Sequence, residues 1–140
     1  VIDPICEADG FVDFITANEI VAGIEARGSS GYEPAVHVAL KIGFNLRQLA
    51  RQLDRYGKRS SAPTIGVASG SFDRLILGTL TTRSFRATGL VVARARELAL
   101  SVEPGHLGID AETYAEMTSG TGLFACRTGT SHSYFVCELL

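Results

Sequence analysis

The sequence lacks any apolar stretch near the roughly 20 residues that a membrane-spanning helix requires. It also lacks an excess of charge, because 13 Lys and Arg residues against 15 Asp and Glu residues give a formal net charge of -2. Such a balance provides no electrostatic footprint for nucleic acid or for an anionic membrane surface. We therefore expect no nucleic-acid partner, no membrane contact by this segment and a cytoplasmic location.

Cysteine and histidine are scarce, which limits metal and redox chemistry. The three cysteines are odd in number and lack C-x-x-C spacing, so we expect reduced thiols in a cytosolic protein. Cys126 and Cys137 fit neighbouring strands, where they would act as small buried hydrophobes. No histidine has a Cys, Asp or Glu at metal-ligand spacing. The third cysteine is Cys6, and the histidines are His37, His106 and His132.

Familiar catalytic signatures are also missing. The sequence contains neither a P-loop nor a dinucleotide-binding fingerprint. Ser69 lies in the segment GVASG at 66–70, which does not have the G-x-S-x-G spacing of a nucleophile elbow. A Ser-His-Asp hydrolase is therefore disfavoured.

What is present is the composition of one globular domain. The 140 residues are 46% hydrophobic and 20% charged, which suits a single folded unit over residues 1–140. Hydrophobic periodicity and turn residues predict mixed helices and strands, and therefore an α+β sandwich with helices on one face of a mainly antiparallel sheet. The predicted elements are a strand hairpin at 11–15 and 19–24, a helix at 34–56, strands at 63–69 and 72–80, a helix at 88–100, a strand at 107–109, a short helix at 111–117 and closing strands at 123–127 and 134–140.

The long helix at 34–56 shows the clearest pattern. Apolar residues recur at helical spacing along one face, and Gly57 stands where a C-cap belongs. Arg47, Arg51 and Arg55 form an i,i+4 ladder on another face, which we interpret as a solvated surface. Asp110 is predicted to cap the short helix that follows it.

Four segments in series resemble the catalytic domain of class III adenylate and guanylate (nucleotidyl) cyclases. TIGVASG at 64–70 followed by ILGTL at 76–80 is similar to the family's glycine-rich strand pair. FRATGLVVARAREL at 85–98 stands where the family has a Y-T-V-x-G-D-x-V-N-x-A-x-R-L stretch, and EPGHLGIDAETY at 103–114 resembles its x-P-G-x-I-x-I-S-x-x-T-Y stretch. GFVDFITA at 10–17 resembles the family's G-G-x-V-K-x-I-G-D hairpin.

The resemblance implies a ferredoxin-like βαββαβ fold and a dimer, homo- or heteromeric, with the site at the interface of two domains. It also implies a nucleotide as the ligand. The family's first strand and first helices have no counterpart in the sequence, so we expect the chain to be a fragment or its true start to lie upstream.

The family's catalytic positions carry different chemistry here. Its second metal-binding aspartate aligns with Ala17, which cannot ligate Mg²⁺ or Mn²⁺; a slip of one residue would place Asn18 there, and Glu19 follows within the strand. The lysine that reads adenine aligns with Asp13 and its partner position with Arg86, so the charges are exchanged.

The family's transition-state residues are replaced as well. Its ribose-positioning asparagine aligns with Ala93, and its phosphate-stabilising arginine aligns with Glu97, whose charge would repel a triphosphate. Arg94 and Arg96 are close in sequence, but a helix turns about 100° per residue, so they are expected to face elsewhere.

Three functions stay open. The first is a catalytically degenerate domain with a regulatory, dimerisation or ligand-binding role in cyclic-nucleotide-type signalling, which needs no cofactor. The second is an active or weakly active cyclase, perhaps half of a dimer, which would use Mg²⁺ or Mn²⁺ to convert ATP or GTP to a cyclic nucleotide and pyrophosphate. The third is an unrelated α+β binding domain.

Overall fold

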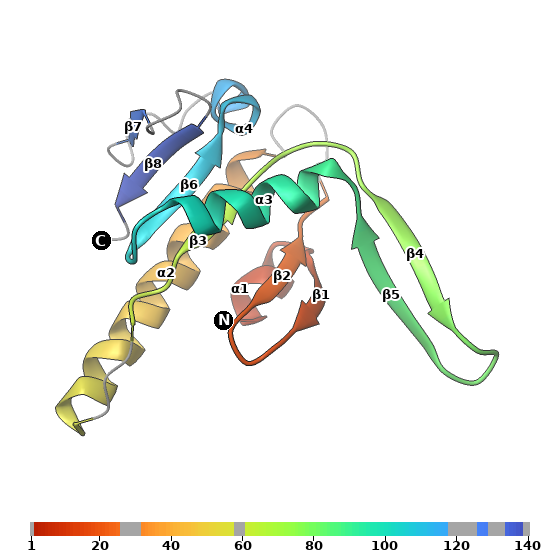
Figure 1. Cartoon of the computed structure of the whole chain (residues 1–140), viewed down its shortest axis with the longest axis horizontal. Coiled ribbons are helices and arrows are strands. Elements are labelled where there is room, and N and C mark those ends of the chain that lie inside the picture. The colour runs from red at the N-terminus through yellow and green to blue at the C-terminus, as the bar shows by residue number, and fades with distance from the viewer. Residues whose placement is uncertain (1, 26–31, 58–60, 118–125, 129–133, 139–140) are drawn as a thin grey trace.

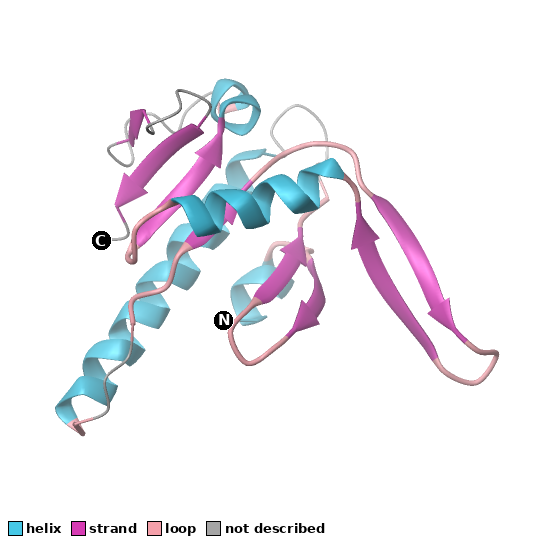
Figure 2. Ribbon diagram, viewed as in Figure 1, coloured by secondary structure: helices cyan, strands magenta, loops and turns pink. Residues whose placement is uncertain are grey.

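A computed structural model describes residues 2–25, 32–57, 61–117, 126–128 and 134–138. Helices and strands alternate in the mixed order expected of an α+β fold (Figures 1 and 2). The elements are α1 (Ile2–Glu7), β1 (Phe11–Ile15), β2 (Ile20–Gly23), α2 (Tyr32–Arg55), β3 (Ile65–Val67), β4 (Asp73–Gly78), β5 (Arg83–Thr88), α3 (Leu90–Ser101), β6 (His106–Asp110), α4 (Ala111–Glu116), β7 (Cys126–Thr128) and β8 (Tyr134–Glu138).

The central sheet has four strands in the order β3-β6-β8-β7. β3 and β6 run parallel, whereas β8 is antiparallel to both β6 and β7. Two antiparallel hairpins, β1–β2 and β4–β5, form separate two-stranded sheets. The sheets are therefore mainly antiparallel, as predicted.

The long helix α2 covers one face of the central sheet. Val36 and Ala39 pack with Leu107, Ile109 and other apolar residues to form the main core. Val36, Leu107 and Ile109 are fully buried. Successive residues of a strand face opposite sides of the sheet. The glycine between Leu107 and Ile109 therefore faces the side of the sheet that lies away from α2.

Helix α3 covers that second face. A Cβ at Gly66 would lie 2.0 Å from the carbonyl oxygen of Ala95, and one at Gly108 would lie 3.1 Å from Val102. The glycines thus let the backbone of α3 approach the sheet directly. The prediction that the helices share one face is wrong for this pair, because the glycines at 66 and 108 create a second packing surface.

Most predicted elements are confirmed with small shifts of their ends. The hairpin β1–β2 and the helix α2 are present, and Gly57 follows α2 with φ 70°. Asp110 caps α4 by accepting a hydrogen bond from the N–H of Thr113 at 2.9 Å. Cys126 and Cys137 are directly opposed in the register of β7 and β8.

Two elements were not predicted. α1 has only six residues, and β5 is rich in polar residues that give no strand periodicity. Gly89, at φ 142°, separates β5 from α3, so the helix begins at Leu90 rather than at residue 88. The predicted loop at 118–122, the strand residues 123–125 and His132 lie outside the described residues.

The hairpin β4–β5 projects from the body as an arm, which we define as residues Asp73–Thr88 (Figure 1). All six residues of β4 are exposed. The strand contains the apolar run Leu75, Ile76 and Leu77, although neither of its faces is covered. Among the described helices, none is long and apolar enough to cross a membrane.

Candidate functional site

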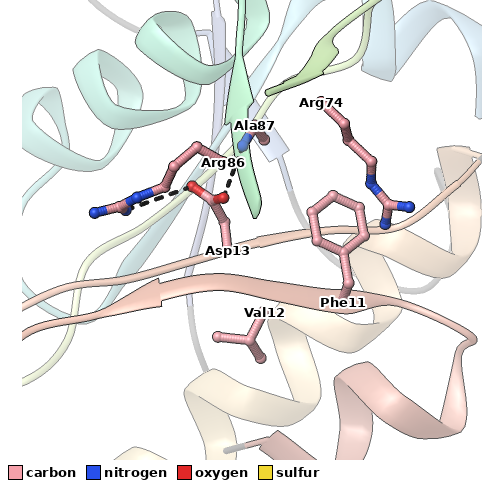
Figure 3. A pocket seen from close by; sticks show the side chains of 6 residues that line it. All are labelled: Phe11, Val12, Asp13, Arg74, Arg86 and Ala87. Carbon is pink, nitrogen blue, oxygen red and sulfur yellow. Dashed lines mark hydrogen bonds and ion pairs between the residues drawn. The ribbon is translucent and has the colours of Figure 1, made fainter. Parts of the chain in front are cut away.

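The hairpin β1–β2 is fixed to the base of the arm by one carboxylate (Figure 3). Asp13, on β1, accepts a hydrogen bond from the backbone N–H of Ala87 on β5 at 2.7 Å. Its second carboxylate oxygen lies 3.9 Å from Nη1 of Arg86. The Asp13 side chain is only 3% exposed, whereas the Arg86 side chain is 44% exposed. The two residues that the resemblance assigns to base recognition are therefore neighbours that contact each other.

An open cleft of about 210 Å³ lies beside this pair. The guanidinium of Arg74 lies 4.2 Å from the centre of the Phe11 ring. Figure 3 shows the guanidinium of Arg86 pointing away from Phe11 and Arg74. The two guanidinium groups therefore do not converge on one point, as a phosphate site would require. The cleft is smaller than the roughly 300 Å³ at which small-molecule sites begin. Its lining residues are Phe11, Val12, Asp13, Arg74, Arg86 and Ala87.

A second set of contacts joins the hairpin β1–β2 to α3. Arg96 donates hydrogen bonds from Nε and Nη2 to the two carboxylate oxygens of Glu19, at 2.6 and 3.0 Å. The guanidinium groups of Arg86 and Arg96 lie 4.5 and 6.0 Å from the centre of the Phe14 ring. The contacts of Arg96 fix the hairpin against α3, and the contact of Arg86 fixes it against β5.

The tip of the β1–β2 hairpin is where the resemblance places a metal. The hydroxyl of Thr16 accepts hydrogen bonds from the backbone N–H groups of Asn18 and Glu19 at 3.3 and 3.0 Å, which closes the turn. Ala17 is exposed and presents a methyl group. The carboxylate of Glu19 is bound to Arg96, so it is not free to ligate a cation.

These residues do not fit a pair of hard divalent cations, which need several carboxylate oxygens. Within the described ranges, no group of three or more His, Cys, Asp or Glu side chains converges on one point. We therefore derive no chemical step through a metal at this hairpin.

The positions to which the resemblance assigns transition-state stabilisation lie on the outer face of α3. Ala93 and Glu97 are both exposed and four residues apart, so they share this face. Neither lines the cleft beside Asp13. Their neighbours Arg94 and Arg96 point elsewhere, as predicted, because each is held by a different carboxylate.

Arg94 belongs to a polar network that was not predicted. It donates to Asp110 at 3.0 Å and to Glu112 at 3.4 Å. Asp110 also accepts hydrogen bonds from the N–H and the hydroxyl of Thr113, and that hydroxyl lies 2.7 Å from the hydroxyl of Ser69. The hydrogen bond with Asp110, and then the charge of Asp110, raise the pKa of Arg94. The D-x-x-T spacing at 110–113 was the only sequence signal for this network.

Comparison with solved structures agrees with the fold. The chain aligns over 98% of its length with 73% of the guanylyl cyclase Cya2, at a TM-score of 0.76 and 15% identity. It aligns over 99% of its length with 75% of the adenylyl cyclase CyaB from P. aeruginosa, at a TM-score of 0.76 and 17% identity. The guanylate cyclase domain of RhGC from Catenaria anguillulae, in complex with GTP, gives a TM-score of 0.73 and 17% identity over 97% of this chain and 76% of that one.

The other two comparisons found nothing: no protein-family model matches the chain, and no curated protein matches it. The fold is therefore that of the class III nucleotidyl cyclase catalytic domain, as the sequence resemblance predicted. At these identities the likeness establishes the fold and not the activity.

Proposed function

We propose that this chain is a catalytically degenerate nucleotidyl cyclase homology domain with a regulatory or dimerisation role in cyclic-nucleotide-type signalling. The observation that carries the proposal is the pairing of Asp13 with Ala87 and Arg86. At the positions assigned to base recognition, the carboxylate and the guanidinium bind groups of the protein itself. A nucleobase would have to displace these contacts before it could be recognised.

The positions assigned to metal and phosphate binding support the same proposal. Ala17 offers no ligand atom, and Glu19 is held by Arg96. Glu97 presents a negative charge on the face of α3 where a triphosphate would need a positive one. Stabilisation of developing charge supplies a large part of enzymatic rate enhancement, so these replacements together would remove most of the catalytic power.

The retained features are those of the framework. Gly66 permits the close packing of α3, and Gly89 takes a positive φ between β5 and that helix. A domain that keeps this framework while losing catalytic groups is suited to pairing with another domain. We propose a dimer through the cyclase-type interface, with a nucleotide as a further candidate ligand.

The test is a turnover measurement. The purified chain is incubated with ATP or GTP and excess Mn²⁺, and cyclic product is sought by mass spectrometry against a heat-inactivated control. We expect no product above the control. Product formation that is lost in the Arg86→Ala variant, while the fold is retained by circular dichroism, would overturn the proposal and establish an active cyclase.

A further inference from the structure

The central sheet places two of the three cysteines opposite each other. β8 lies between β6 and β7. The Cα atom of Cys137 on β8 is the register partner of Leu107 on one side and of Cys126 on the other. Directly opposed residues of antiparallel strands lie on the same face of a sheet. Positions 126 and 137 are therefore neighbours in one row across the sheet.

The position of β8 in this row is fixed by its pairing with β6. The register joins His106–Asp110 of β6 to the whole of β8, and β6 contributes the fully buried Leu107 and Ile109 to the main core. A slip of β8 by one residue would place Glu138, instead of Cys137, opposite Leu107 on the face that α2 covers. A charged residue disfavours that alternative, so the register that opposes the two cysteines is the stable one.

The backbone spacing at such a pair suits a disulfide. Directly opposed residues of antiparallel strands have Cα atoms about 4.5 or about 5.5 Å apart, depending on whether the pair is hydrogen-bonded. Disulfides join Cα atoms that are about 4.4–6.8 Å apart. Both kinds of pair lie within this range, so β7 and β8 can be bridged in their present register. Cys6 lies on α1, outside the central sheet, and has no such opposed partner.

A bond at this place would act on the weakest edge of the sheet. β7 is the outer strand of the described sheet, contains only Cys126–Thr128 and pairs with β8 alone. A short strand with one neighbour opens more easily than a central strand, because few hydrogen bonds hold it. A covalent link from its first residue to β8 would prevent this opening.

We propose that Cys126 and Cys137 are a site of reversible disulfide formation that fastens β7 to β8. Disulfides that form in reducing compartments are typically transient and redox-sensing, so the proposal agrees with the expectation of reduced thiols in the resting protein. The inference concerns the edge of the sheet and does not rest on the proposed function.

The reaction balances as a thiol–disulfide exchange with a small-molecule disulfide such as oxidised glutathione. The thiolate of one cysteine attacks a sulfur atom of the small disulfide, whose S–S bond breaks and releases one thiolate. The thiolate of the other cysteine then attacks the mixed disulfide, forms the bond between the two Sγ atoms and releases the second thiolate. The two cysteines lose two electrons, and the small disulfide becomes two thiols that take up the two protons.

The first measurement is peptide mapping of the folded parent chain after incubation with oxidised glutathione. Remaining thiols are alkylated, and the chain is digested with trypsin without reduction. Cleavage after Arg127 separates the two cysteines into peptides 97–127 and 128–140, which only a disulfide can hold together. We expect these two peptides to be linked, and to separate after treatment with dithiothreitol. No linked peptide, or equal amounts of peptides linked through Cys6, would overturn the proposal.

The second measurement is thermal unfolding of Cys6→Ser, which keeps the opposed pair and removes the third thiol. Its oxidised form should unfold at least about 5 °C above its reduced form, because the disulfide limits the freedom of the unfolded chain. The matched control, Cys6→Ser with Cys126→Ser, should unfold at the same temperature with and without oxidant. A linked pair that leaves the unfolding temperature unchanged would show that the bond does not fasten β7, and would overturn that part of the proposal.

Discussion

Asp13 and Ala87 are 74 residues apart in sequence and are joined by a hydrogen bond of 2.7 Å from the backbone N–H of Ala87 to the Asp13 carboxylate. The bond links the edge of β5 to β1, which are otherwise members of different sheets. A backbone N–H at a strand edge needs an acceptor once it is removed from water. Asp13 supplies that acceptor, so it stabilises the junction between hairpin and arm as well as standing at a position of functional interest.

Two substitutions of Asp13 separate its hydrogen bond with Ala87 from its attraction to Arg86. Asp13→Ala removes the acceptor and should lower the free energy of unfolding by about 1–3 kcal/mol. Asp13→Asn keeps an acceptor oxygen and loses only the attraction to Arg86, whose side chain is partly exposed, so its cost should stay below about 1 kcal/mol. Urea unfolding measures both. Equal stabilities for the alanine variant and the parent would show that water replaces the carboxylate at no cost.

Gly66 tests the packing of α3 on the sheet. A Cβ at this position would lie 2.0 Å from the carbonyl oxygen of Ala95 and 2.6 Å from the backbone nitrogen of Ala99. Because both neighbours are backbone atoms, α3 would have to shift, and Gly66→Ala should destabilise the protein by about 1–3 kcal/mol or more.

The matched control for this prediction is Gly57→Ala. Gly57 has open space around it and a φ of 70°, so its variant carries only the left-handed backbone cost of roughly 1–2 kcal/mol. Thermal unfolding together with near-ultraviolet circular dichroism distinguishes the two effects, because only Gly66→Ala should alter the packing of the core. An unchanged spectrum and stability for that variant would contradict the close approach of α3 to β3.

The fold was predictable wherever sequence periodicity reflects burial. The apolar residues in 11–15 and the helical spacing in 34–56 belong to segments that contact other elements, so these elements were identified. β5 was missed because the arm is exposed and its strand carries no core-facing pattern. Gly66 and Gly108 lie inside strands that were predicted, but only the parallel register of β3 and β6 shows that they form one surface for α3.

The site was predictable only as a set of positions. Alignment brought Asp13 and Arg86 together as a pair, and they are indeed in contact. Alignment could not show that Ala87 holds Asp13 or that Arg96 holds Glu19, because both contacts join elements more than 70 residues apart. Such contacts depend on the relative placement of two hairpins and a helix, which no local pattern records.

The arginine ladder on α2 provides a test of a surface predicted to be solvated. Arg51 and Arg55 are exposed, while Arg47 is partly buried. Arg51→Ala and Arg55→Ala should each change the free energy of unfolding by less than about 0.5 kcal/mol, because exposed charges contribute little. Arg47→Ala should cost somewhat more through lost packing of its aliphatic stem. Chemical denaturation checks the order, and a large loss at position 55 would indicate that this end of α2 is packed.

The network around Asp110 should be the most sensitive polar element of the domain. Asp110 and Thr113 are 3% and 0% exposed, and they connect α4 to Ser69 and to Arg94 on α3. Asp110→Ala removes a helix cap and one of the two hydrogen-bond partners of the buried Thr113 hydroxyl, which keeps Ser69, so we expect a loss of about 2–3 kcal/mol. Asp110→Asn preserves the cap and should lose less than half as much.

Arg94→Ala isolates the charged part of the same network. The raised pKa of Arg94 means that the stabilisation from its charge is fully present below the ordinary pKa of an arginine and is lost only as the pH rises through the raised one. The difference in unfolding free energy between the parent and Arg94→Ala should therefore not change through deprotonation of Arg94 between about pH 6 and 9. Urea unfolding of both proteins across this range is the measurement. A difference that falls steadily toward pH 9 would contradict this prediction, because it would show that a group other than the Arg94 guanidinium titrates in this range and controls the stability of the junction.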